Sequence, residues 1–204
     1  MTPYEEFWDW FVRHETELFD FEKDQKRIFD KLLAALRKVN QDLVFEFGLK
    51  KQEEGKERQE FVISADGIKS AFPAVISLRN TAPDLPRWQI TAFRPRRTTI
   101  NIVEIGDRRI DPKDVQFTLL SDGKNAGLYL FIPDFRENDD AFKQIGYLML
   151  DEALGEFDVE TRLGLIKMLT PEGHTHGERH PLPELPRLFD QLTVQLEGRS
   201  GKPS

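Results

Sequence analysis

The chain has 204 residues, of which 39% are hydrophobic and 32% charged, a mix typical of a globular protein with about one domain's worth of length. It contains no cysteine, which excludes thiol nucleophiles, disulfide bonds and thiolate zinc sites. The formal net charge of −7 disfavours nucleic acid and anionic membranes as partners. The sequence shows neither a membrane-spanning run nor a signal peptide, so a cytoplasmic protein is expected.

Hydrophobic periodicity predicts the elements of the chain. Apolar residues recur at three- and four-residue steps over residues 3–20 and 22–39, which predicts two helices or one bent helix. After residue 40 the apolar residues recur with a period of two, which predicts strands. The further predicted elements, in chain order, are strands over residues 43–47 and 59–64, a helix over 68–80, strands over 88–93, 99–105, 115–120 and 127–132, a helix over 139–154 and a strand over 157–169.

The links between the strands of residues 88–132 are too short for crossover connections, so these strands are expected to be antiparallel. The predicted fold class is therefore α+β, with a mainly antiparallel sheet of about six or seven strands and helices packed chiefly on one face. Residues 1–170 are expected to form a single domain. The proline-rich residues 171–198 are expected to form an extended strap and a short C-terminal helix, and residues 199–204 a disordered tail.

Aromatic residues cluster near the N-terminus, where Phe7, Trp8, Trp10 and Phe11 lie within five residues. They cannot all lie on one helical stripe, and Trp8 lies off it. One interpretation is that Trp8 packs against a second element such as the C-terminal helix. The other is a docking surface for another chain, because tryptophan is enriched at interface hot spots.

Three segments carry a resemblance to a known family: FWDWF, EFVISADGIKSAFPAV and APDLPRWQITAFRPR. They resemble a family of uncharacterised bacterial proteins. The resemblance covers Phe7 to Arg96 and, more weakly, the segment GEFDVETRLGLI. It implies one cytoplasmic domain and carries no catalytic residue.

Histidines offer one candidate metal site, because His174, His176 and His180 fall within seven residues. Three imidazoles can hold Zn²⁺ or Ni²⁺. The segment is rich in glycine and proline, however, and no carboxylate is clearly placed to orient the rings. We therefore expect no native metal, and since no phosphate-binding glycine motif occurs either, no cofactor.

Arginines form a candidate anion site, because Arg94, Arg96 and Arg97 follow the strand of residues 88–93. Guanidinium groups can bind carboxylates and phosphates through bidentate hydrogen bonds. The alternative is that these arginines pair with acidic residues on the protein's own surface.

Alternation along the strands predicts a second candidate surface. Apolar side chains such as Phe45, Phe117 and Leu128 fall on one face, which helices are expected to cover. The opposite face is expected to be open and to hold a ligand or partner, or else to be a solvated face with ion pairs across the strands. Its expected polar residues are Glu46, Gln116, Thr118, Tyr129, Glu160 and Arg162.

These patterns favour a binding or protein-interaction module whose partner is a protein or a small anionic ligand. The alternative is a hydrolase or lyase that uses Glu46, Glu160, Tyr129 and Arg162 on the open face. A serine nucleophile elbow and the basic stripe of a nucleic-acid-binding protein are both absent. The oligomeric state is left open by the sequence.

Overall fold

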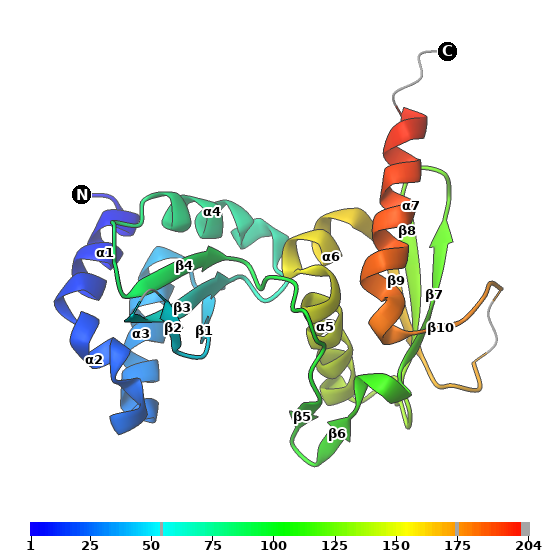
Figure 1. Ribbon diagram of the computed structural model, residues 1–204, viewed down its shortest axis with the longest axis horizontal. Helices are drawn as coiled ribbons and strands as arrows, with labels where there is room; N and C mark the ends of the chain where they lie inside the picture. Colours follow the sequence, from blue (N-terminus) through cyan, green and yellow to red (C-terminus); the bar gives the residue numbers. More distant parts are fainter. Residues whose placement is uncertain (54, 174–175, 201–204) are drawn as a thin grey trace. The chain divides into compact units, whose positions relative to one another are not determined.

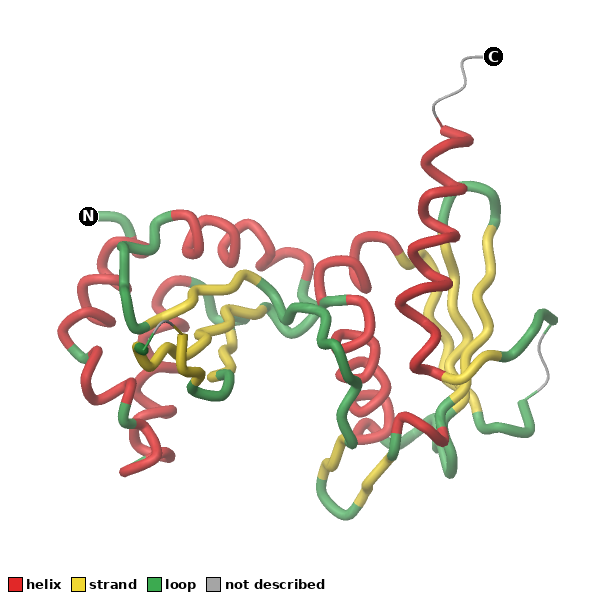
Figure 2. The backbone as a smooth tube through the Cα atoms, in the orientation of Figure 1, coloured by secondary structure: helices red, strands yellow, loops and turns green. Residues whose placement is uncertain are grey.

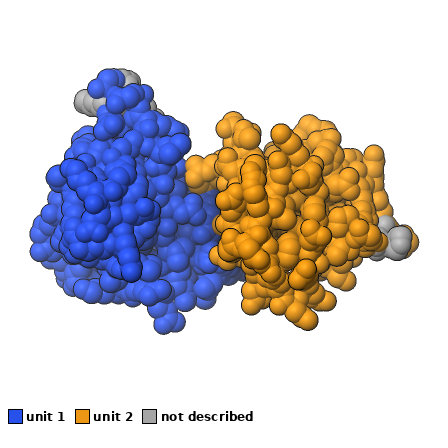
Figure 3. Space-filling model, turned by 90° about the horizontal axis from the view of Figure 1, so that it is seen from below, with its two compact units in different colours: residues 1–94 blue, residues 95–204 orange. Residues whose placement is uncertain are grey.

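The computed structural model describes residues 1–53, 55–173 and 176–200. It divides the chain into two compact units, unit 1 (Met1–Arg94) and unit 2 (Pro95–Ser204), which Figure 3 shows in different colours. The predicted boundary near residue 170 does not coincide with this division. Each unit is described by itself below.

Unit 1 contains four α-helices and four strands among its described residues (Figure 1). They are α1 (Pro3–Arg13), α2 (Glu15–Phe19), α3 (Gln25–Val39), β1 (Val44–Phe47), β2 (Lys51–Glu53), β3 (Lys56–Ser64), α4 (Phe72–Asn80) and β4 (Trp88–Ala92). A capping box formed by Thr2 and Glu5, with Pro3 in the first turn, starts α1. Pro73 lies in the first turn of α4, where its missing N–H costs no hydrogen bond.

The sheet of unit 1 is mixed. Its central strand β3 pairs antiparallel with β1 and β2 and parallel with β4, the strand that follows α4. Phe61 and Ile63 of β3 are fully buried and share a core with residues of α1, α3 and α4. The ring centroids of Phe11 and Trp88 lie 5.1 Å apart, so aromatic contacts join the first helix to the last strand of this core.

The described residues of unit 2 form a four-stranded sheet and a separate two-stranded hairpin. A loop leads from β4 to the hairpin (Figures 1 and 2). The elements of unit 2 are β5 (Val103–Ile105), β6 (Arg108–Ile110), β7 (Gln116–Ser121), β8 (Ala126–Phe131), α5 (Asp140–Leu154), α6 (Glu156–Arg162), β9 (Leu163–Leu169), β10 (His180–Pro181) and α7 (Leu185–Ser200). The larger sheet has the order β10-β7-β8-β9, with β8 and β9 parallel. Side chains of α5 and α7 pack with Phe117, Leu128 and Leu130 in one core.

The α+β class is confirmed, but the single antiparallel sheet of six or seven strands is wrong. The strands are divided over separate small sheets, and two of the pairings are parallel. The helices α4 in unit 1 and α5 with α6 in unit 2 each connect two parallel strands, which is the crossover that parallel pairing requires.

The expected strand over residues 157–169 begins only at Leu163, because residues 156–162 form α6. The buried residues Val159 and Leu163 are four positions apart, a helical spacing that also satisfies a period of two. The C-terminal helix is longer than expected and continues to Ser200 as α7. The end of the expected tail, residues 201–204, lies outside the described residues. Within the described part of the chain, no helix is both long and apolar enough to cross a membrane.

Candidate functional site

The first predicted arginine, Arg94, binds two carboxylates of its own unit. Its Nε donates to Glu46 of β1, and its Nη2 lies 3.0 Å from Asp66 Oδ1. Asp66 and Phe93, which follow the parallel strands β3 and β4, both have positive φ, at 50° and 63°. These left-handed residues turn the chain sharply where the two strands end, and there Arg94 meets Asp66.

Arg96 binds three partners within unit 2. Its Nε donates to the carbonyl of Leu154 at 2.8 Å, and its Nη atoms lie 2.9 Å from Asp190 and 3.1 Å from Asp158. The hydrogen bond to Asp190 is the main cause of a raised Arg96 pKa. The backbone N–H of Arg97 donates to the carbonyl of Glu152 at 2.8 Å. Arg94 and Arg96 therefore have the carboxylate partners that the surface ion-pair alternative requires.

The predicted open sheet face does not form as one surface. Glu46 lies on β1 in unit 1, whereas Gln116 and Tyr129 lie on β7 and β8 in unit 2. Glu160 and Arg162 belong to α6, not to a strand, because the strand was predicted to begin too early. The four residues of the enzyme alternative thus come from three different elements, and no single sheet face presents them.

Within unit 2 the alternation itself is correct. Thr118 pairs with Tyr129, and Gln116 with Phe131, on the face opposite the buried Phe117. Part of this face is covered by the segment after β9. The Arg179 guanidinium lies 3.8 Å from the centroid of the Phe131 ring.

Two hydrogen bonds and one close backbone approach hold that segment in place. Arg179 Nη1 donates to the carbonyl of Pro171 at 2.6 Å, and its Nη2 donates to that of Gly173. Gly177 approaches Thr118 so closely that a Cβ at position 177 would lie 2.6 Å from Thr118 Cγ2. The residues of the expected strap therefore cover Thr118, which is 2% exposed.

The histidine candidates divide between the described and undescribed parts of the chain. His174 lies outside the described residues. His176 is exposed, and His180 is on β10 with its ring centroid 5.7 Å from that of Phe117. Among the residues that the structure describes, no group of three or more His, Asp or Glu side chains is arranged to hold a metal ion.

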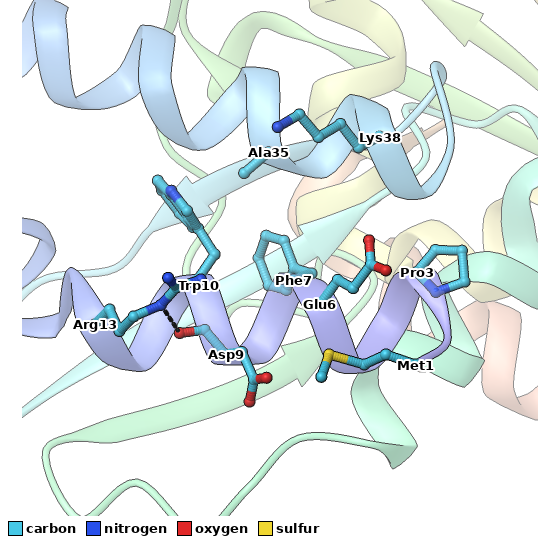
Figure 4. A pocket seen from close by; sticks show the side chains of 9 residues that line it. All are labelled: Met1, Pro3, Glu6, Phe7, Asp9, Trp10, Arg13, Ala35 and Lys38. Carbon is cyan, nitrogen blue, oxygen red and sulfur yellow. Dashed lines mark hydrogen bonds between the residues drawn. The ribbon is translucent and has the colours of Figure 1, made fainter.

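A hollow beside α1 is the candidate site that the structure adds (Figure 4). Its volume is about 480 Å³, within the range of ligand sites. Figure 4 shows Glu6, Phe7 and Trp10 projecting from α1 toward Ala35 and Lys38 of α3. Its lining residues are Met1, Pro3, Glu6, Phe7, Asp9, Trp10, Arg13, Ala35 and Lys38.

The apolar part of this hollow, which we call the α1–α3 hollow, is aromatic. Phe7 is 3% exposed, whereas Trp10 is half-buried. The Trp10 ring stacks on His14 with centroids 4.5 Å apart, and His14 Nδ1 lies 2.7 Å from the Trp10 carbonyl oxygen. This stacking holds an amphipathic ring in a fixed position at the surface.

The charged part of the α1–α3 hollow differs from the arginine cluster. Within the described residues, the structure gives no hydrogen bond or ion pair to the side chains of Glu6, Asp9 and Lys38. Arg13 Nε donates to the backbone carbonyl of Asp9 at 3.1 Å, so its guanidinium leans along α1. Charges of both signs therefore lie around an aromatic floor.

A second hollow, of about 450 Å³, lies on the other flank of α1 and shares Asp9 and Arg13 with the first. We call it the α1–α4 hollow. Trp8 lines this hollow and is only 3% exposed. Its Nε1 donates a hydrogen bond to the Leu78 carbonyl at 2.9 Å. Trp8 thus packs against a second element, as one interpretation of the sequence expected, and that element is α4. The other lining residues are Glu5, Val12, Thr81 and Pro83.

The sequence indicated part of this region through its aromatic cluster, but it pointed to Trp8 instead of Trp10. It gave no signal for Lys38, because only the packing of α3 against α1 brings that side chain to the α1–α3 hollow.

Comparison of the chain with protein-family models, curated proteins and solved structures found no match. The resemblance to an uncharacterised bacterial family therefore stays a prediction.

Proposed function

We propose that this protein is a protein-interaction module and that α1, with the hollows on both of its flanks, is the binding surface. The observation that carries the proposal is a set of charges, Glu6, Asp9 and Lys38, beside the half-buried Trp10; among the residues that the structure describes, their side chains have no hydrogen-bond or ion-pair partner. Tryptophan is enriched at interface hot spots, and the rim of an interface is typically polar.

The two hollows favour a protein segment over a small ligand. They share Asp9 and Arg13, so a ligand filling both would straddle the outer ridge of α1. Val12, which lines the second hollow, is 47% exposed and extends the apolar part of this surface. A single small anion would contact only one side of the ridge.

The charges specify the chemistry of the partner. Two carboxylates, Glu6 and Asp9, lie near the apolar floor, and Lys38 lies at the α3 side of the α1–α3 hollow. We infer a segment that inserts an apolar side chain beside Trp10 and brings a lysine or arginine to Glu6 and Asp9. A carboxylate of the same segment would bind Lys38. Such complementarity gives specificity and fast association.

Selection from a random peptide library displayed on phage, with the full chain as bait, tests the proposal. Enriched peptides are expected to share an apolar residue beside a basic one. Their affinity is expected to fall about tenfold or more for the double variant Glu6→Gln/Asp9→Asn. The control Asp30→Asn/Asp114→Asn removes the same charge from exposed positions outside both hollows and should bind normally. If no peptide is enriched, or if both double variants bind equally, the proposal is wrong.

A further inference from the structure

The strand β9 forms one edge of the unit 2 sheet. In the strand order β10-β7-β8-β9, the described residues pair β9 with β8 alone. At the opposite edge, His180 and Pro181 of β10 pair with Phe117 and Gln116, so that edge is partly covered. In the described part of the chain, the seven-residue strand Leu163–Leu169 therefore has no paired strand on its other side.

The register identifies the backbone groups on that side. The carbonyl of Leu169 accepts a hydrogen bond from Ile132 N–H at 2.9 Å, so Leu169 points its polar groups toward β8. Because alternate residues of a parallel strand bond to the same neighbour, Leu165 and Lys167 do likewise. The N–H and C=O groups of Ile166 and Met168 therefore point outward from the sheet.

This edge carries few of the features that protect edge strands from pairing. It has no proline, and its only charge is Lys167. Leu165, two residues before Lys167 and on the same face, is 48% exposed. Native edges that must stay single are short, bulged, covered by another element or carry proline or charged side chains. In β9 the one register irregularity lies at its start, beside Ala126 and Gly127, and leaves Leu165–Leu169 regular.

We propose that a second copy of this chain pairs with β9 in antiparallel fashion, with the two-fold axis at Ile166. Ile166 is the middle residue of Leu163–Leu169, so this register overlaps the whole strand. The outward N–H and C=O groups of Ile166 would form a reciprocal pair of hydrogen bonds with Ile166 of the second copy. The two sheets would then form one continuous sheet.

The charge of Lys167 disfavours the neighbouring register. With the axis at Ile166, Lys167 lies opposite Leu165 of the second copy, so the lysine stem covers the exposed leucine. An axis at Lys167 would instead place the two lysines directly opposite each other, which is destabilising. The edge is thus complementary to itself, which favours a second copy over an unrelated strand.

Sedimentation of the full chain with three charge variants tests this pairing. Leu165→Lys places a positive charge opposite Lys167 of the other copy and should raise the dimer dissociation constant at least about tenfold. Leu165→Glu places a negative charge there and should dimerise at least as well as the parent. The double variant Leu165→Lys/Lys167→Glu should recover dimerisation. Because residue 165 is exposed, each variant is expected to fold.

Hydrogen exchange gives an independent measurement of the same contact. The amides of Ile166 and Met168 should exchange slowly in the dimer and faster in Leu165→Lys at the same concentration. Amides of Lys167 and Leu169, bonded to β8, should be unaffected. The pairing is refuted if the parent chain stays monomeric up to about 0.5 mM, a limit that corresponds to an association free energy near −4.5 kcal/mol. Equal dissociation constants for Leu165→Lys and Leu165→Glu would also refute it.

Discussion

The guanidinium of Arg96 lies 2.9 Å from the carboxylate of Asp190, although 94 residues separate them in sequence. Asp190 belongs to α7, and Arg96 also binds Asp158 of α6 and the carbonyl of Leu154 at the end of α5. One arginine thus connects three helices of unit 2. Its position in the chain suggested an anion site, but its partners are side chains and backbone of the same unit.

Removing this connection is expected to lower the stability of unit 2. Arg96→Met keeps much of the side-chain volume but removes all three contacts, so the free energy of unfolding should fall by about 1–2 kcal/mol. A double-mutant cycle with Asp190→Asn, measured by urea denaturation, should give a coupling energy of about 0.5–1 kcal/mol, since Asp190 is partly exposed. A coupling of zero would show that the pair contributes nothing to stability.

The two faces of the unit 2 sheet are expected to respond differently to truncation. Phe117 is fully buried, so Phe117→Ala should cost about 3–5 kcal/mol. Tyr129 is half-buried on the opposite face, and Tyr129→Phe should change stability by less than about 1 kcal/mol. Thermal denaturation of the two variants would measure this difference. Similar losses for both would contradict the assignment of the faces.

Hydrophobic periodicity correctly predicted features that depend on neighbouring residues in the sequence. The period of two correctly placed Thr118 and Tyr129 on the face opposite Phe117, and the period of 3.6 correctly predicted the N-terminal helices. Strand alternation did not predict that Glu46 and Tyr129 lie in different units, because it carries no information about which sheet a strand joins. Glu160 and Arg162 were misplaced because the buried Val159 and Leu163 fit both periods.

The candidate site was predictable only in part for the same reason. Trp10 lies in a conspicuous aromatic cluster, but its exposure relative to Trp8 depends on α4, which covers Trp8. Lys38 reaches the α1–α3 hollow through the packing of two helices, and no spacing in the sequence encodes that contact. Pairing of Arg94 with Glu46 and Asp66 likewise depends on the tertiary fold.

A carboxylate of α2, Glu17, which pairs with two residues of α3, is expected to make stability depend on pH. Lys31 and then Arg27 hydrogen-bond Glu17 and lower its pKa from the ordinary value of 4.5. A pKa that is lower in the folded state contributes stability that is present above 4.5 and is lost as the pH falls through the folded value.

The variant Glu17→Gln should therefore be less stable than the parent at neutral pH, with a difference that shrinks as the pH falls below 4.5. Urea denaturation at a series of pH values measures it. Because Glu17 is partly exposed, the difference at neutral pH should also decrease in high salt. A difference independent of pH would mean that the ion pairs with Lys31 and Arg27 do not contribute.

The surface around α1 can be examined through tryptophan fluorescence before any partner is known. Trp8 and Trp88 are only 3% and 2% exposed, whereas Trp10 is half-buried beside the α1–α3 hollow. Acrylamide should therefore quench a single component of the emission, and Trp10→Phe should abolish that component while leaving the melting temperature within a few degrees.

A peptide that occupies the α1–α3 hollow should protect Trp10 from the quencher, because it excludes solvent from the ring. Lys38→Glu, which leaves the aromatic floor intact, should weaken protection by a peptide that carries the carboxylate partner. Quenching that persists unchanged in Trp10→Phe would place the accessible tryptophan elsewhere and remove the aromatic anchor from the proposed binding surface.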